Sequence, residues 1–221
     1  KQAFEKQKIS LPALKDHEVL IESEAFGLNY ADVMARNGLY REAPPIPCVI
    51  GYEVVGRIIE VGAKGNPNLV GQRVLAFCRF GGYGRHVITT QLAVLQIGDL
   101  PSAEVLALST QGVTAYYMSD YLAPIQKGDR VLIHAAAGGV GQIFCQWAKS
   151  LGCKVIGTVG SDEKIQIAKN NGCDHVVNYS KENFAQKVKE ITNSEGVPVV
   201  YDGVGKKTFD GSIECLKVRG M

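Results

Sequence analysis

The sequence predicts an α/β protein whose two halves follow different patterns. The first half has short β-prone runs separated by glycine and proline, and the second alternates apolar strand-like runs with longer helical stretches. Short strands with frequent turn signals are typical of a barrel or sandwich, whereas strict β–α alternation is typical of a parallel sheet with helices on both faces. A glycine-rich turn follows the first strand of the second half. We therefore expect a compact β-barrel followed by a doubly wound parallel sheet.

Composition and charge narrow the class of protein. The 221 residues are 46% hydrophobic and 21% charged, which suits one or two globular domains. The formal net charge of +2 excludes the polybasic surface of a typical nucleic-acid binder. No apolar run approaches the ~20 residues that cross a membrane. The six cysteines show no CxxC spacing, and several lie in apolar stretches, which is typical of reduced, buried thiols in a cytoplasmic protein.

The first half is expected to contain four strands and one short helix. The helix begins near Asn29 and ends at Gly38, and a longer helix-like stretch covers residues 103–121. The expected strands span residues 18–27, 51–62, 72–77 and 83–90. Because the patterns change within the helix-like stretch, we place the domain boundary there, between residues 108 and 109.

The second half is expected to contain four strands, each followed by a helix. The strands span residues 130–136, 154–159, 175–179 and 197–201, and the helices span residues 142–150, 162–170, 181–192 and 207–217. Right-handed connections then nearly determine the topology. The sequence stops where a fifth strand is due, whereas a complete dinucleotide fold has six. We therefore expect the sequence to be part of a longer chain.

The turn after the first of these strands carries the clearest functional signal. It reads Ala-Ala-Gly-Gly-Val-Gly and matches G-x-G-x-x-G with Ala136 in place of the first glycine. Gly138 lets the backbone approach a pyrophosphate, and Gly141 lets the helix pack closely on the strand. The helix start offers N–H groups and a positive dipole end to phosphates. An ordinary βα turn is the alternative, but the βαβ context favours a dinucleotide site.

The end of the next strand indicates which dinucleotide binds. An NAD-specific site places an acidic residue ~20 residues after the turn, where this sequence has Gly160. Asp162 and Glu163 follow as first-turn helix residues that complement the dipole. Lys164 could reach a 2′-phosphate, although a solvated surface lysine is the alternative. The pattern favours NADPH over NADH.

Several strings together resemble a known family. They lie at residues 27–32, 38–40, 112–114, 134–141, 145–149, 157–160 and 200–202. The sequence resembles the zinc-independent quinone oxidoreductases, the zeta-crystallin-like branch of the medium-chain dehydrogenase/reductases. Residues 31–36 are also similar to the vesicle amine transport protein-like members. The resemblance covers nearly the whole chain, and its motifs are specific for the family but not for one substrate.

The resemblance implies a GroES-like catalytic domain over residues 1–108, a Rossmann NADPH-binding domain over residues 109–221, and a homodimer. The implied cofactor residues are Tyr30, Asp32, Met34 and Thr114 at the nicotinamide end, Gly138, Gly139 and Val140 at the pyrophosphate, Gly160, Ser161, Lys164 and Tyr179 around the 2′-phosphate, and Val204 and Gly205 near the adenosine or ribose. Besides Lys164, three of them have a structural alternative. Tyr179 could be a half-buried strand aromatic, Thr114 could bond back to its own helical turn, and Asp32 could cap its helix.

The resemblance also implies chemistry without zinc. Zinc-dependent relatives have a cysteine where this chain has Asn29, and a Gly-His-Glu string where it has Gly-Tyr-Glu at residues 51–53. Catalytic zinc needs three protein ligands, and the four histidines show no ligand spacing. We expect no metal, and we expect His134 to be a packing or hydrogen-bonding residue.

Without a Lewis acid, reduction of a quinone or a conjugated C=C bond is favoured, because the acceptor delocalises the charge itself. Asn29, Tyr30 and Tyr40 are candidate donors to a developing oxyanion or enolate. Tyr40 matches a proposed proton donor of related enoyl reductases, although packing on Pro44 or Pro45 is the alternative. The leading hypothesis is an NADPH-dependent quinone reductase. A reductase of enones or enoyl compounds, and a non-catalytic NADPH-binding protein, are the alternatives.

Overall fold

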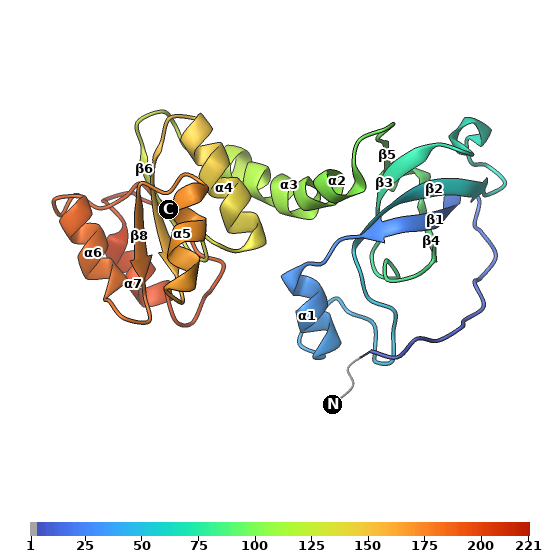
Figure 1. Ribbon diagram of the computed structural model, residues 1–221, viewed down its shortest axis with the longest axis horizontal. Coiled ribbons are helices and arrows are strands. Elements are labelled where there is room, and N and C mark those ends of the chain that lie inside the picture. Colours follow the sequence, from blue (N-terminus) through green and yellow to red (C-terminus); the bar gives the residue numbers. More distant parts are fainter. Residues whose placement is uncertain (1–3) are drawn as a thin grey trace. The chain divides into compact units, whose positions relative to one another are not determined.

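The computed structural model describes residues 4–221 and divides into two compact units. The first unit ends at Thr110 and the second begins at Gln111. Each unit contains one sheet with its own hydrophobic core (Figure 1).

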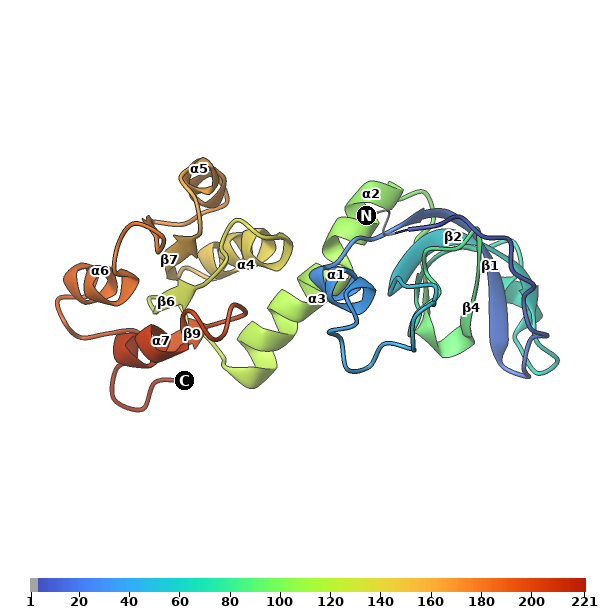
Figure 2. The ribbon, with the colours of Figure 1, turned by 90° about the horizontal axis from the view of Figure 1, so that it is seen from below.

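The sheet of the first unit is antiparallel, with strand order β4-β1-β2-β3-β5. Its strands are β1 (Glu18–Phe26), β2 (Glu53–Val61), β3 (Arg73–Phe77), β4 (His86–Thr90) and β5 (Val94–Gln96). Register shifts within β1 bend the sheet, which curves around a core that includes Val19, Val54 and Val74 (Figure 2). The sequence did not predict β5, because three residues after a 3₁₀ turn at Gln91–Ala93 carry too little periodicity.

The expected short helix is α1 (Tyr30–Arg36), and the left-handed Gly38 follows it. The stretch expected to be one helix over residues 103–121 is instead α2 (Ser102–Leu108), α3 (Thr110–Tyr117) and a π-helical turn at Met118–Leu122. The break comes at Ser109, whose hydroxyl has two alternative acceptors, the Leu106 carbonyl oxygen at 2.9 Å and the Glu53 carboxylate. A serine side chain that bonds locally in this way competes with helical hydrogen bonding.

The second unit contains a parallel sheet with strand order β8-β7-β6-β9. Its strands are β6 (Arg130–Ile133), β7 (Lys154–Val159), β8 (His175–Asn178) and β9 (Val199–Tyr201). Its helices are α4 (Gly139–Ser150), α5 (Glu163–Asn170), α6 (Phe184–Ile191) and α7 (Phe209–Cys215). The predicted β–α alternation and parallel sheet are confirmed.

Helices cover both faces of this sheet, as the sequence predicts (Figure 2). Ile133 packs in one core with Phe144 of α4, whereas its neighbour Leu132 packs in another core with Phe184 of α6. Adjacent strand residues point to opposite faces, so a strand covered on both sides is apolar throughout. Within residues 4–221, no helix has the length and apolar character needed to cross a bilayer.

The turn after β6 differs from the expectation. The strand ends at Ile133 rather than residue 136, and α4 begins at Gly139 rather than residue 142. The cause is a tight turn in which Ala135 adopts a positive φ of 49° and accepts a hydrogen bond from the Gly138 N–H at 2.8 Å. A left-handed residue cannot continue a strand. Gly139 and the last motif glycine, Gly141, therefore lie within the first turn of the helix, and the motif glycine Gly138 is its N-cap.

Candidate functional site

The glycine turn presents the start of α4 with little side-chain cover. Gly138 is the N-cap, and both Gly138 and Gly139 are exposed. A Cβ on Gly141 would overlap the Ala135 carbonyl oxygen and lie 2.8 Å from the Ala136 Cα. The first N–H groups of a helix have no intrahelical acceptor, and the helix dipole favours anions there. The predicted pyrophosphate residues Gly138, Gly139 and Val140 thus form a cradle suited to phosphate.

One residue beside this cradle was missed by the sequence reasoning. The side chain of Gln111 on α3 lies so close to Gly139 that a Cβ there would overlap it. Thr114, a predicted cofactor residue, is half-buried three positions later on α3. Residues three apart share a helix face, so Gln111 and Thr114 lie on the same side of α3. The adjacent string at residues 112–114 was the available signal, and it pointed to Thr114 alone.

The predicted 2′-phosphate residues meet at the carboxyl ends of β7 and β8. A Cβ on Gly160 would lie 2.9 Å from the Tyr179 hydroxyl oxygen, and the Ser180 hydroxyl donates to the Gly160 carbonyl oxygen at 2.9 Å. The Lys164 N–H donates to the Ser161 carbonyl oxygen at 3.2 Å, which places the exposed Lys164 beside the same turn. Tyr179 is half-buried against the α6 core, so its ring packs while its hydroxyl faces Gly160.

The first acidic residue after Gly160 is Asp162, and its side chain is directed toward β8. Asp162 is the N-cap of α5, but its carboxylate accepts from the Asn178 amide at 2.7 Å and pairs with the Lys181 ammonium. These two partners lower the pKa of Asp162. Only Glu163 remains in the first turn as an acid that complements the dipole, as expected. The Asp162 carboxylate therefore already has a cationic and an amide partner within the protein.

The loop after β9 is held by a carboxylate that the sequence reasoning did not single out. Asp202 Oδ1 accepts from the N–H groups of Val204 and Gly205, each at 2.9 Å, and from the Thr208 hydroxyl at 2.8 Å. Its Oδ2 accepts from the Ser212 hydroxyl at 2.7 Å. Although burial raises the pKa of Asp202, these hydrogen bonds lower it overall. Val204 and Gly205 are thus positioned through Asp202.

His134 is a hydrogen-bonding residue, as expected. It is buried at the end of β6, where Nδ1 lies 2.7 Å from the Thr158 hydroxyl and Nε2 lies 3.0 Å from the Ser212 hydroxyl. Because Ser212 donates to Asp202, we assign the Nε2–H as donor to Ser212 and Nδ1 as acceptor from Thr158. Burial lowers the pKa of His134, and the Asp202 charge opposes it only partly. The neutral imidazole therefore links the end of β6 to β7 and to α7.

This burial makes stability depend on pH. The folded pKa of His134 is below the unfolded value of about 6.5, so its contribution is complete above pH ~6.5 and is lost as pH falls toward the folded pKa. In that window we expect His134 to contribute at most about 1.4 kcal/mol per pH unit to the loss of unfolding free energy. Urea unfolding between pH 7.5 and 5.5 measures this effect. The unfolding free energy of His134→Gln should fall less with falling pH than that of the parent protein, whereas His175→Gln, an exposed control, should behave like the parent. An unchanged slope in His134→Gln would contradict the assignment.

In the first unit, Asp32 anchors the start of α1. The Asn29 N–H donates to Asp32 Oδ2 at 2.9 Å, which confirms the expected capping role. Asp32 is 1% exposed, and burial raises its pKa, while the Asn29 amide and the Tyr83 hydroxyl oppose the shift. Of the other predicted nicotinamide residues here, Tyr30 is 77% exposed and Met34 is half-buried.

A buried carboxylate at the start of β2 organises this region. Glu53 is fully buried and accepts from the Asn29 side-chain amide at 2.9 Å and the Thr110 N–H at 3.0 Å. The hydroxyls of Ser109 and Thr110 also donate to it. In the sequence, Glu53 stands out only as the last residue of the Gly-Tyr-Glu string. An acidic residue directly before an apolar run was the available signal.

Tyr40 packs edge-on against Tyr52, with ring centroids 5.9 Å apart and planes at 70°. Burial and the neighbouring Tyr40 phenol raise the pKa of Tyr52. Tyr52 in turn contacts Phe80, with centroids 4.9 Å apart.

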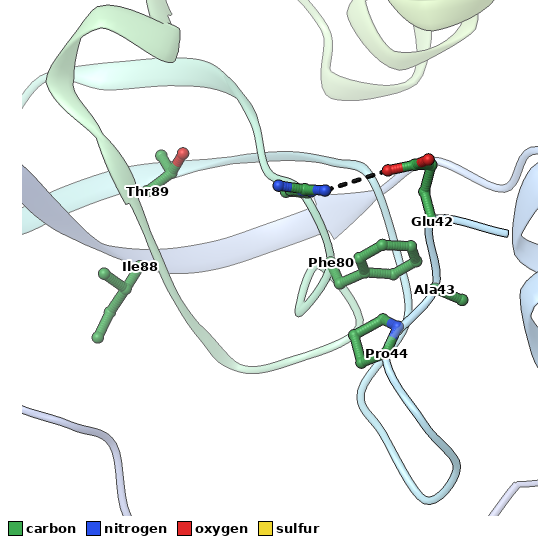
Figure 3. Close-up of a pocket in the computed structure, with 7 residues that line it drawn as sticks. Glu42, Ala43, Pro44, Phe80, Ile88 and Thr89 are labelled. Carbon is green, nitrogen blue, oxygen red and sulfur yellow. Dashed lines mark hydrogen bonds and ion pairs between the residues drawn. The ribbon is translucent and has the colours of Figure 1, made fainter.

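Phe80 lines an open hollow of about 490 Å³ (Figure 3). The other residues lining the hollow are Glu42, Ala43, Pro44, Arg79, Ile88 and Thr89. Within the described part of the chain, no three His, Cys, Asp or Glu side chains gather as metal ligands would.

Comparison with known proteins identifies the family. Residues 15–119 match the alcohol dehydrogenase GroES-like domain, and residues 139–221 match the zinc-binding dehydrogenase family. A 2-haloacrylate reductase from a Burkholderia species is 37% identical over 226 residues, which cover 99% of this chain and 67% of that protein. A quinone oxidoreductase from Salmonella typhimurium is 40% identical over 208 residues. The chain belongs to the quinone oxidoreductases of the medium-chain dehydrogenase/reductase superfamily.

Solved structures agree with this assignment. The crystal structure of Escherichia coli quinone oxidoreductase complexed with NADPH is similar with a TM-score of 0.91 and 35% identity, over 97% of this chain and 66% of that one. The GroES-like and Rossmann folds expected from the sequence are thereby confirmed. The chain spans 63% of the length of the Salmonella typhimurium relative, and the alignment covers 93% of this chain.

Proposed function

We propose that the protein is a zinc-independent, NADPH-dependent reductase that transfers hydride or electrons to quinones. The observation that carries this proposal is the bare glycine turn at the carboxyl edge of a parallel sheet, with Gly160 where an NAD-specific site has an acid. This edge lies at a point where the strand order reverses, because β7 and β9 flank β6 on opposite sides. Ligands of open α/β sheets bind at such a point. Similarity to quinone oxidoreductases supports the choice of acceptor.

The second unit would bind the NADPH. Gly138, Gly139 and Val140 would hold the pyrophosphate, and Val204 and Gly205 would lie at the adenosine or ribose. Gly160, Ser161, Lys164 and Tyr179 would surround the 2′-phosphate. The Asp162 carboxylate is already bound to Asn178 and Lys181. It is therefore directed to these two side chains and not to the proposed 2′-phosphate position. When bound, NADPH supplies the hydride.

The first unit would supply position and a proton. We propose that the Tyr40 hydroxyl donates a proton to the acceptor oxygen and that the Asn29 side chain, held by Glu53, helps to orient the acceptor. Tyr30, Met34 and Thr114 would line the nicotinamide end. Asp32, a buried residue in the first turn of α1, would act there by fixing the helix start that carries Asn29 and Tyr30.

The Lys164 assignment predicts a selective loss of affinity. Lys164→Ala should weaken NADPH binding about tenfold or more and leave NADH binding nearly unchanged, because only NADPH carries the 2′-phosphate. Nucleotide fluorescence titration measures both constants. Lys169→Ala, an exposed lysine in the last turn of the same helix, is the matched control. Equal losses for both nucleotides would overturn the assignment.

The activity itself is tested by following NADPH absorbance with a quinone and an enoyl thioester side by side. Oxidation with the quinone alone supports the proposal. Preference for the enoyl thioester would instead support reduction of conjugated C=C bonds, the second candidate, which similarity to a 2-haloacrylate reductase favours. NADPH binding without oxidation of either compound would favour a non-catalytic NADPH-binding protein.

We further propose a cytoplasmic homodimer without a specific nucleic-acid partner. All six cysteines are free thiols, which suits a reducing compartment. The homodimer rests on the family resemblance. Light scattering of the purified protein tests it, and a monomer would contradict it.

A further inference from the structure

Two buried cysteines of the second unit lie in direct contact. The Sγ atoms of Cys145, on α4, and Cys173, just before β8, are 3.3 Å apart. Cys145 is fully buried and Cys173 is 7% exposed. An S–S bond of about 2.05 Å requires the sulfurs to approach by roughly 1.2 Å more. The two residues are 28 positions apart, so a bond would tie α4 to the start of β8.

The sulfur of Cys173 is also packed beneath the glycine turn. The position of a Cβ on Gly157 of β7 lies 2.6 Å from this sulfur and 2.8 Å from the Ala136 Cβ. Gly157 therefore leaves just enough space for Cys173 beside the turn. Because such a packed interior transmits small displacements, movement of Cys173 toward Cys145 would disturb the residues that support the cradle.

We propose that Cys145 and Cys173 are an oxidisable dithiol that closes to an intrachain disulfide in response to hydrogen peroxide and weakens NADPH binding at the glycine turn. The Cys173 thiolate attacks one peroxide oxygen, which breaks the O–O bond and releases hydroxide. The resulting Cys173 sulfenic acid is attacked by the Cys145 sulfur, which forms the S–S bond and releases water. In total, two thiols and one peroxide give one disulfide and two waters.

Two features favour Cys173 as the first sulfur to react. It is the more exposed of the pair, so a small neutral oxidant reaches it first. The hydrogen bond with Cys145 lowers the pKa of Cys173, and the Lys149 ammonium lowers it further. Burial and the Asp174 charge raise this pKa, but they do not cancel the decrease. A lower pKa increases the thiolate fraction, which is the reactive form.

The thiol chemistry can be tested without any assumption about the enzymatic activity. The reduced, purified protein is treated with hydrogen peroxide and examined by intact mass, thiol titration and non-reducing peptide mapping. We expect a loss of about 2 Da and two thiols, a peptide linking Cys145 to Cys173, and reversal by dithiothreitol. Cys145→Ala and Cys173→Ala should each abolish the link. Cys153→Ala, a buried cysteine whose sulfur contacts the Gln126 carbonyl oxygen at 3.3 Å, should not.

Overoxidation to sulfinic acid, a different pairing, or no loss of thiols would overturn the dithiol. The effect on the cofactor site rests on the proposed function and has its own measurement. NADPH affinity, followed by nucleotide fluorescence, should fall several-fold on oxidation and recover on reduction, with no response to peroxide in Cys145→Ala. A disulfide that leaves the affinity unchanged would overturn the coupling to the turn. If neither reduced nor oxidised protein binds NADPH, the proposed function fails while the mass result for the dithiol stands.

Discussion

Gly141→Ala should lower the unfolding free energy by about 2–3 kcal/mol and abolish measurable NADPH binding. The added Cβ would overlap the Ala135 carbonyl oxygen and lie 2.8 Å from the Ala136 Cα. Both contacts are with backbone, so relief requires the turn to open, and overpacking of this kind typically costs 1–3 kcal/mol. Urea unfolding and nucleotide titration measure the two effects.

Gly203→Ala is the matched control for this change. A Cβ at Gly203 meets no atom within 4 Å, and its φ is not positive. It should change stability by less than about 0.5 kcal/mol. If the two variants unfolded alike, the close approach of α4 to the turn would not be what requires glycine at position 141.

Glu53→Ala should be the most destabilising change in the first unit, with a loss of about 3–5 kcal/mol. It removes the acceptor of the Asn29 amide and of the Ser109 and Thr110 donors, in a site with no exposed surface. Loss of a charged acceptor leaves several buried donors unsatisfied at once. Urea unfolding provides the measurement.

Two further variants test whether the loss of stability comes from the buried Glu53 carboxylate rather than from any replacement of a glutamate on this strand. Glu53→Gln keeps the shape and one acceptor oxygen, so its loss should be smaller than that of Glu53→Ala. Glu60→Ala, an exposed glutamate on the same strand, should stay within about 0.5 kcal/mol of the parent. Equal losses for Glu53→Ala and Glu60→Ala would contradict the role of the buried network.

Local patterns predicted part of the proposed nucleotide site. Gly138 and Gly141 were recognised from spacing alone, because a strand, a tight turn and a helix start are contiguous in the chain. The grouping of Gly160 with Tyr179 was implied by the family resemblance, and the structure explains it by the parallel order of β7 and β8, whose carboxyl ends lie at the same edge. The limits of β6 and α4 were wrong, because no local signal marked Ala135 as left-handed.

The sequence by itself determined the β–α alternation, the glycine turn and the missing acid at Gly160, because each depends on residues close together in the chain. Only the tertiary structure showed that Glu53 gathers donors from positions 24 to 57 residues away, or that Cys145 meets Cys173. Buried polar groups and sulfur contacts depend on which segments pack against one another. The periodicity of the sequence does not indicate which distant segments pack together. The hydrogen-bond partners of a buried polar group are therefore known only once the chain is folded.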